Sequence, residues 1–254
     1  MGRLDGKVAV ITGGNSGIGE ATAKLFAKEG ARVVITARRE AELKRVADEI
    51  KAQGGTVMYV PGDVRVTADV DRVIEETVKA FGTIDILVNN AGIGDKHIPT
   101  VKLSDEWMEE VIDTDLKGVI RFCRAALRHM EKAGHGVIVN VASIGGVYGC
   151  AGASYSAAKN GVIALTKNIA IQYHARGIRA NSISPGSTLT PLFDPEKFEG
   201  ADEEMIELTK RVHVHEYEDM IPPEQQASVI LFLASDESQA VNGQDIVVDR
   251  GGRL

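Results

Sequence analysis

The chain has 254 residues, of which 44% are hydrophobic and 26% charged, a composition that indicates a globular protein with a sizeable core and excludes a disordered chain. The formal net charge is −7 and both signs are interspersed, so we predict no nucleic-acid partner. No stretch reaches the roughly 20 apolar residues of a membrane span, and two cysteines, Cys123 and Cys150, are too few for a disulfide framework, so we expect a cytoplasmic protein.

Short β-branched runs alternate along the chain with longer segments of helical periodicity, a pattern typical of βαβ units in a parallel sheet. The predicted strands span residues 7–12, 31–36, 56–60, 84–89, 136–142, 178–184 and 244–248. The predicted helices span residues 17–29, 39–53, 67–81, 103–133, 154–175 and 222–234, with one more at 201–211. Because the strand runs are apolar throughout, helices should cover both faces of the sheet. We expect a single α/β domain, residues 1–254, with a doubly wound parallel sheet of about seven strands.

A glycine-rich turn follows the first predicted strand, from Thr12 to Gly19 in the sequence TGGNSGIG. Glycine lets the backbone turn tightly and approach a pyrophosphate, and the free N–H groups at the start of the next helix favour an anion. The turn therefore predicts a dinucleotide site, although a purely structural turn is the alternative. The residues predicted to bind the coenzyme phosphates are Gly13, Asn15, Ser16, Gly17, Ile18 and Gly19.

The end of the second predicted strand indicates which coenzyme is preferred. An acidic side chain at this position accepts hydrogen bonds from the ribose of NAD and repels a 2′-phosphate, but this chain has Ala37, followed by Arg38 and Arg39. Two guanidinium groups can pair with a 2′-phosphate, so we expect NADP(H) rather than NAD(H). The alternative is a solvated helix start, although a helix N-terminus disfavours basic residues electrostatically.

Tyr155 and Lys159 lie four residues apart in a helical segment, so both side chains project from one face of the helix. A free phenol, with a pKa of about 10, is a poor base near neutrality. A neighbouring ammonium favours the phenolate and is expected to lower that pKa, which brings proton transfer within reach. Taken alone, the pair could be a chance arrangement on a surface helix. Together with the dinucleotide turn it predicts a catalytic pair.

Four motifs in this order resemble the short-chain dehydrogenase/reductase family over nearly the whole chain: the TGxxxGxG turn, NNAG at 89–92, Tyr155-x-x-x-Lys159, and Pro185-Gly186. The resemblance implies a Rossmann-type fold and an enzyme that transfers a hydride between nicotinamide and a secondary alcohol or ketone. It also implies further residues that contact the coenzyme. These are Asp63 and Val64 at the adenine, Asn90, Ala91 and Gly92 near the adenine ribose, and Ile183, Pro185, Gly186 and Thr188 or Thr190 toward the nicotinamide.

The same resemblance implies that Ser143 hydrogen-bonds the substrate oxygen and that Lys159 also binds the nicotinamide ribose, while a helix or turn cap is the alternative reading of Ser143. The chain departs from the family at Asp115, where relatives usually have a catalytic asparagine that supports a water relay to the lysine. An ionised aspartate accepts hydrogen bonds but cannot donate one, and it should raise the pKa of the lysine. We expect a working enzyme with an altered pH profile.

The irregular region at residues 185–221 is predicted to form a substrate loop or lid. An apolar pocket suits a bulky ketone, such as a steroid or bile acid, or an acyl chain, and the alternative is that several of its side chains are core or subunit contacts. The residues predicted to line it are Gly145, Tyr148, Cys150, Leu189, Leu192, Phe193, Phe198 and Tyr217. His213 and His215 lack a third ligand at a sensible spacing, so no metal site is expected.

Other functions stay open at the level of sequence. A 3-oxoacyl-thioester reductase would need a basic patch for its acyl carrier protein, and the clustered candidates are Arg121, Arg124 and Arg128. An NADP-binding sensor without chemistry is disfavoured by the retained catalytic residues and mildly favoured by Asp115. An enoyl reductase of similar fold is disfavoured because such relatives place the tyrosine further from the lysine. The family resemblance also implies a homotetramer, formed through the helices at 103–133 and 154–175.

Overall fold

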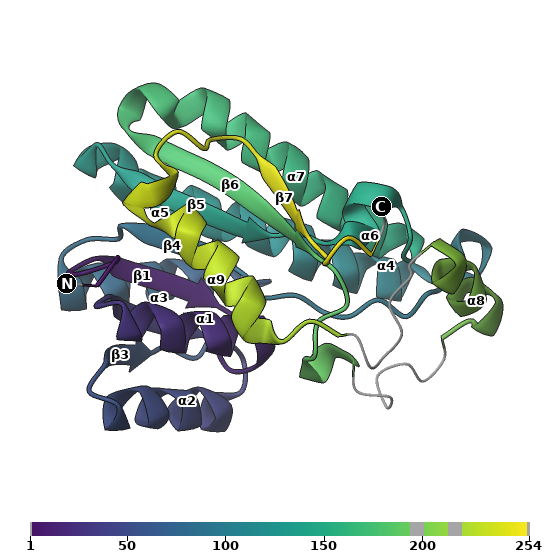
Figure 1. Cartoon of the computed structure of the whole chain (residues 1–254), viewed down its shortest axis with the longest axis horizontal. Coiled ribbons are helices and arrows are strands. Elements are labelled where there is room, and N and C mark those ends of the chain that lie inside the picture. Colours follow the sequence, from purple (N-terminus) through teal and green to yellow (C-terminus); the bar gives the residue numbers. More distant parts are fainter. Residues whose placement is uncertain (1, 194–200, 213–219, 253–254) are drawn as a thin grey trace.

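The computed structural model describes residues 2–193, 201–212 and 220–252, in which seven parallel strands form one sheet (Figure 1). The strand order is β3-β2-β1-β4-β5-β6-β7, so the direction of winding reverses between β1 and β4. The predicted doubly wound parallel sheet is confirmed, and every predicted strand is present. The strands are β1 (Val8–Thr12), β2 (Arg32–Thr36), β3 (Thr56–Tyr59), β4 (Ile86–Asn89), β5 (Gly136–Val141), β6 (Ile178–Pro185) and β7 (Asp245–Val248).

Helices cover both faces of the sheet and enclose two apolar core layers, as the apolar strands require. α3, α5 and α7 pack on one face, where Phe122 and Met130 are buried, and α1, α2 and α9 pack on the other, around Phe26. These helices are α1 (Gly17–Lys28), α2 (Glu40–Ala52), α3 (Thr67–Phe81), α5 (Gly118–Ala133), α7 (Ala153–Tyr173) and α9 (Pro223–Ala234). None of the helices in the described ranges is long and apolar enough to cross a membrane.

The helix predicted at 103–133 is interrupted, which corrects the sequence prediction. It consists of α4 (Asp105–Ile112), a π-helical turn at Asp113–Lys117, and α5. A single wider turn leaves the apolar periodicity on either side almost unchanged, so the sequence pattern does not reveal it. Such turns are frequent at functional sites, and this one carries Asp115, whose side chain is fully buried.

A short helix, α6 (Ile144–Tyr148), is also absent from the predicted elements. Gly145 and Gly146 give its sequence a low helix propensity, so the pattern favours a loop. The helix forms because it packs closely on α7: a Cβ on Gly146 would lie 2.7 Å from the backbone nitrogen of Asn160. The helix predicted at 201–211 is confirmed as α8 (Glu203–Val212).

A chain of buried side-chain hydrogen bonds fixes α7 to the centre of the sheet. The Asn89 amide at the end of β4 donates to Asn140 Oδ1 of β5 at 2.8 Å, and the Asn140 amide donates to Thr166 Oγ1 of α7 at 2.8 Å. All three side chains are buried, and their mutual pairing offsets the cost of removing them from water. The helix that carries Tyr155 and Lys159 is therefore held in a defined position relative to β4 and β5.

Candidate functional site

The carboxyl ends of the parallel strands meet at one edge of the sheet, and the predicted site residues follow them. β1 runs into the glycine-rich turn, β4 ends just before Asn90, β5 ends shortly before Ser143, and β6 ends at Pro185. In open α/β sheets, ligands bind outside this edge, where the strand order reverses. The reversal between β1 and β4 places such a crevice beside the glycine-rich turn.

The glycine-rich turn forms a cradle that side chains would fill. Gly13 has φ +65°, in the left-handed region, and a Cβ on Gly19 would lie 2.2 Å from the Gly13 carbonyl oxygen. Ser16 is the N-cap residue of α1, but its side chain makes no capping hydrogen bond. The N–H groups in the first turn of α1 are thus open to an anion, and the turn fits a pyrophosphate.

Thr12 ties the glycine-rich turn to the NNAG segment. Its hydroxyl oxygen accepts the N–H groups of Asn90 and Ala91 at 3.0 and 2.9 Å. The Asn90 amide donates to the Thr12 carbonyl at 3.0 Å and to the Gly13 carbonyl at 3.3 Å. The Asn90 side chain therefore holds the turn in place, and its contact with a ribose stays a prediction.

Buried hydroxyl groups without partners lie along the same edge. Among the residues that the structure describes, Thr36 at the end of β2 and Thr114 in the π turn have hydroxyl oxygens with no hydrogen-bond partner. Buried polar atoms are rarely left in this state. Thr114 lines a small gap together with Val64 and Ala91.

Asp63, the predicted adenine contact, already has a partner that sequence reasoning missed. The Arg65 guanidinium donates to both carboxylate oxygens, with Nη2 2.7 Å from Oδ2, and the Arg65 backbone N–H donates to Oδ1 at 2.9 Å. These contacts hold the pKa of the Asp63 carboxyl below its usual range, although burial acts in the opposite direction. An adenine amino group would have to share this carboxylate with Arg65.

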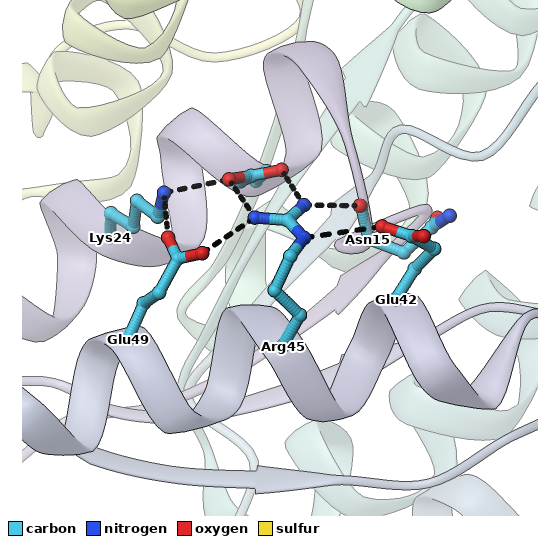
Figure 2. A network of polar contacts seen from close by, with 6 residues as sticks. Asn15, Lys24, Glu42, Arg45 and Glu49 are labelled. Atoms are coloured by element: carbon cyan, nitrogen blue, oxygen red, sulfur yellow. Dashed lines mark hydrogen bonds and ion pairs between the residues drawn. The ribbon is translucent and has the colours of Figure 1, made fainter.

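Figure 2 shows Arg45 of α2 surrounded by acidic side chains of α1 and α2. Its Nη2 donates to Glu20 Oε2 at 2.7 Å and to the Asn15 carbonyl oxygen at 3.4 Å, and its Nη1 donates to Glu49 Oε1 at 2.8 Å. Lys24 completes the network through Glu20 and Glu49. These contacts hold α2 against the glycine-rich turn, and the charge of Arg45 is balanced by acidic side chains of the protein itself.

Arg38 and Arg39, at the start of α2, are in a different situation. Both are exposed, and within the described ranges neither guanidinium group makes a hydrogen bond or ion pair. Arg38 acts electrostatically on Asp63, so it lies near the same edge of the sheet. Unlike Arg45, these two cations have their hydrogen-bonding capacity available for a ligand.

Lys159 and Asp115 form a buried ion pair at the centre of the site. Lys159 Nζ lies 3.4 Å from Asp115 Oδ2, and the two residues are 4% and 0% exposed. Nζ also donates to the Val141 carbonyl at 3.3 Å, and Asp115 Oδ1 accepts the Ile93 N–H at 2.9 Å. Gly92 leaves space for the pair, because a Cβ there would lie 3.1 Å from Asp115 Oδ2. The departure at Asp115 therefore places a carboxylate in direct contact with the predicted catalytic lysine.

The Tyr155 ring lies against this pair, with its centroid 5.6 Å from Lys159 Nζ. Burial raises the pKa of the Tyr155 phenol above its ordinary value; Lys159 acts to lower it and Asp115 adds to the rise. The lowering predicted from Lys159 alone is therefore wrong in net direction, because burial outweighs the ammonium. Burial acts to lower the pKa of Lys159, but Asp115 and Tyr155 outweigh it, so the pKa of this ammonium lies above its ordinary value.

Ser143 has the capping role considered for it, while its contact with a substrate oxygen stays a prediction. It is the N-cap residue of α6, and its Oγ accepts the Gly145 N–H at 3.0 Å, which is a capping contact. It also lies close enough to the Tyr155 phenol to act to lower its pKa. Gly145 packs beside both, since a Cβ there would lie 3.3 Å from Tyr155 Cε1 and 3.4 Å from Ser143 Oγ. The structure thus brings Ser143, Tyr155, Lys159 and Asp115 into one cluster.

The segment after β6 folds back over the glycine-rich turn, and it distinguishes Thr188 from Thr190. Thr188 is buried, and its hydroxyl contacts the Gly186 carbonyl at 2.9 Å and the Gln226 amide at 3.2 Å. Thr190 packs on the turn, because a Cβ on Gly17 would lie 2.9 Å from Thr190 Cγ2. Of the two alternatives, Thr190 is the one in contact with the predicted phosphate site.

The residues predicted to line the substrate pocket are only partly described. Leu192 packs against residues 93–99, where a Cβ on Gly94 would lie 3.3 Å from Leu192 Cγ. Tyr148 and Leu189 are exposed, Cys150 is buried, and Phe193 ends a short turn at Pro191–Phe193. The predicted residues Phe198 and Tyr217, and the histidines His213 and His215, lie outside the described residues. In the described ranges no group of three or more His, Cys, Asp or Glu side chains could hold a metal ion.

A cavity of about 410 Å³ lies away from this site, at the amino ends of β4, β5 and β6. Several of its charged groups make internal contacts: His135 Nε2 lies 2.7 Å from Asp85 Oδ1, and Arg179 donates to the Leu233 and Ser235 carbonyls. It contains none of the predicted site residues, and we assign it no function.

Asp95 is a residue of the site that sequence reasoning missed. Its Oδ2 accepts the N–H of Gly152, the N-cap residue of α7, at 2.6 Å, and its charge acts on Tyr155. No motif spacing marks Asp95, and the only sequence signal is an acidic residue soon after NNAG.

Known proteins resemble this chain over nearly its full length. The model of a family described as enoyl-(acyl carrier protein) reductase matches residues 13–252. The chain is 40% identical over 252 residues to the 3-oxoacyl-[acyl-carrier-protein] reductase FabG of Thermotoga maritima, covering 98% of each chain. It is 35% identical to 3beta-hydroxysteroid dehydrogenase 2 of Eggerthella lenta, covering 98% of this chain and 95% of that protein. The solved structure of levodione reductase matches with a TM-score of 0.89 at 32% identity, covering 98% of both chains.

The buried ion pair predicts a distinctive stability pattern. Asp115→Ala should lower the free energy of unfolding by about 3–5 kcal/mol, because it leaves Lys159 buried without a counter-charge. The double variant Asp115→Ala, Lys159→Met should be more stable than Asp115→Ala alone. Urea unfolding followed by the fluorescence of Trp107, the single tryptophan, measures both.

Asp71→Ala is the matched control, since Asp71 is 41% exposed in a surface pair with Arg128, and it should change stability by less than about 0.5 kcal/mol. A double variant less stable than Asp115→Ala would show that the lysine is not a charge in need of a partner.

Proposed function

Because this chain belongs to the short-chain dehydrogenase/reductase family, we propose that it is an NADP(H)-dependent oxidoreductase that interconverts a secondary alcohol and a ketone. The observation that carries the proposal is the cluster of Ser143, Tyr155 and Lys159 at the sheet edge that also holds the glycine-rich turn. The assignment of these residues as catalytic is part of the proposal, as is a single catalytic domain with a substrate segment at 185–221.

We propose that Tyr155 donates the proton to the ketone oxygen, and takes it back in the reverse direction. Ser143 orients that oxygen with a second hydroxyl donor, as its position beside Tyr155, with Gly145 packed against both, supports. The bound coenzyme supplies or accepts the hydride at C4 of its nicotinamide. Lys159 holds a positive charge beside the phenol and stabilises the phenolate left after proton donation. A phenol with a raised pKa stays protonated near neutrality, which suits ketone reduction.

The preference for NADP(H) rests on Arg38 and Arg39. Both are exposed at the end of β2 without an internal partner in the described part of the chain, and no acidic residue takes the place that would repel a 2′-phosphate. Arg45 is excluded as a phosphate ligand because Glu20 and Glu49 already pair with it. The other coenzyme contacts follow the glycine-rich turn, Asn90 to Gly92, and the segment at Pro185 to Thr190.

We infer that the substrate is a cyclic or otherwise bulky ketone, such as a steroid-type ketone. The hydroxysteroid and levodione enzymes among the similar proteins support this class. A 3-oxoacyl-thioester reductase is the second candidate, since a reductase of that name is 40% identical to this chain. Two of the three arginines that would form the basic patch for a carrier protein have acidic partners, which reduces the positive charge of that patch. Arg121 pairs with Asp113 at 2.7 Å, and Arg128 lies 3.8 Å from Asp71. The homotetramer and the cytoplasmic location stay predictions.

Oxidation of NADPH at 340 nm with a panel of cyclic ketones, steroids and acetoacetyl thioesters tests the proposed function. We expect turnover with NADPH, and we expect Tyr155→Phe to lower kcat by about 10²–10⁴-fold, because it removes the proton donor. Tyr173→Phe, at the far end of α7, is the control and should keep wild-type kcat. Tight NADP(H) binding without turnover of any substrate would favour a coenzyme-binding sensor.

Coenzyme preference has its own test. Arg38→Asp should weaken NADP(H) binding by about 10²-fold and leave NAD(H) nearly unchanged, because a carboxylate would then face the 2′-phosphate. Isothermal titration with both coenzymes measures the ratio of the two Kd values. Arg128→Asp carries the same charge change on an arginine that is 62% exposed on α5 and should leave that ratio unchanged. An unaltered ratio in Arg38→Asp would refute the assignment.

Asp115→Asn tests how the departure from the family affects catalysis. Burial is the largest cause of the raised pKa of Tyr155 and Asp115 adds to it, while at Lys159 Asp115 raises the pKa against the effect of burial. Removal of the Asp115 charge therefore makes the phenolate easier to form. The rise of kcat/KM with pH for alcohol oxidation, where Tyr155 acts as the base, should move to lower pH, with a plateau within about tenfold of wild type. An identical pH profile would mean that Asp115 serves structure alone.

A further inference from the structure

We propose that Asp95 is a positioning residue for catalysis: its carboxylate fixes the start of α7, and with it Tyr155, and connects that helix to α8 in the predicted substrate lid. The inference rests on the proposed function and deepens it. Asp95 lies in the segment between β4 and α4, three residues after the end of the NNAG motif, and neither a motif nor the resemblance assigns it a role.

The Asp95 carboxylate supplies the cap that α7 lacks in its own sequence. The N-cap residue is Gly152, which has no side chain to offer, and Asp95 Oδ2 accepts its N–H at 2.6 Å. The contact is close-packed, because a Cβ on Gly152 would lie 2.4 Å from Asp95 Oδ1 and 3.3 Å from the Ile98 nitrogen. A carboxylate at a helix N-terminus is favoured by the helix dipole. Tyr155 follows in the first turn, so a shift of Gly152 displaces the phenol.

The Asp95 side chain is buried, so its contact with Gly152 belongs to the interior of the proposed active site. The Asp95 side chain is only 9% exposed, and a carboxylate removed from water must be compensated by hydrogen bonds or charge. The charged groups that act on the Tyr155 phenol come from three elements: Lys159 on α7, Asp115 in the π turn, and Asp95. Burial is the largest cause of the raised pKa of Tyr155, and Asp115 and Asp95 add to it. Asp95 therefore affects both the position of the Tyr155 phenol and its pKa.

The same residue faces α8 through His97. His97 Nδ1 lies 3.5 Å from Asp95 Oδ2 and 3.4 Å from Thr209 Oγ1 of α8. His97 has φ +49°, a left-handed conformation that is uncommon outside glycine and has to be held by its surroundings. Lys102 Nζ and Asp202 Oδ2, 2.5 Å apart, form a second contact between the two segments. His97 and the Lys102–Asp202 pair therefore link α8 to the segment that holds the first turn of α7.

Two substitutions separate the hydrogen bond from the charge. Asp95→Asn keeps an oxygen that can accept the Gly152 N–H, so it should retain kcat within about threefold of wild type at the pH plateau. Asp95→Ala loses that oxygen and should lower kcat by about 10²-fold, because a small misplacement of a reacting group slows the reaction by that amount. The KM for coenzyme should not change in either variant. Asp105→Ala, which alters an exposed carboxylate in the first turn of α4, is the control and should keep wild-type kcat.

A second readout needs neither coenzyme nor turnover. In protein labelled with ¹³C at tyrosine Cζ, the Tyr155 resonance is assigned with Tyr155→Phe and followed with pH by NMR. Both Asp95 variants should titrate at lower pH than wild type, because a negative charge that opposes the phenolate has been removed. Thermal unfolding of each variant shows whether the protein is folded under the conditions of the titration.

Three results would overturn the proposal. Asp95→Ala could keep both the kcat and the Tyr155 titration of wild type, which would leave Asp95 without a role in catalysis. Both variants could raise the KM for the ketone alone, which would identify a substrate contact. They could also lower only the midpoint of thermal unfolding, which would identify a structural cap. A wild-type protein without any turnover would contradict the proposed function instead, and the Tyr155 titration would still show whether Asp95 acts on the phenol.

Discussion

A buried ammonium group requires a counter-charge, and this requirement organises the site. Lys159 is 4% exposed, and left alone its charge would cost several kcal/mol. Asp115 supplies the charge from the π turn, and the Val141 carbonyl at the end of β5 supplies a second acceptor. Three elements distant in sequence must therefore meet at one point. Gly92 belongs to the same arrangement, because a larger residue would intrude on the pair.

The charges of this pair also influence the pKa of Tyr155 in the proposed active site. Two carboxylates, Asp115 and Asp95, and one ammonium, Lys159, act on the Tyr155 phenol. With burial added, the phenol is held in its protonated form, which is the form that can donate to a ketone oxygen. The aspartate at 115 thus changes more than one hydrogen bond, because its charge reaches both the lysine and the tyrosine.

The proposed coenzyme side of the site is built mainly from backbone. The glycine-rich turn offers N–H groups at the start of α1, and Thr12 and Asn90 hold that turn against β4. Side chains next to this backbone supply the proposed selectivity between coenzymes. Arg45 pairs with acidic side chains and holds α2 against the turn (Figure 2). Arg38 has no hydrogen bond or ion pair within the described part of the chain, so its guanidinium group can bind a ligand. Arg45 within α2 therefore serves structure, and Arg38 just before α2 is left for the proposed recognition of the coenzyme.

The sequence by itself determined the parallel sheet, most of the helices, the glycine-rich turn and the spacing of Tyr155 and Lys159. These are local patterns, because apolar periodicity and glycine freedom depend on neighbours along the chain. Only the tertiary structure decided the π turn at Asp115, helix α6, the partner of Asp63, the net direction of the Tyr155 pKa and the place of Asp95. Asp95 meets Gly152 across 57 residues of sequence. Burial and the approach of distant charges have no local signature, so they exist only once the chain has folded.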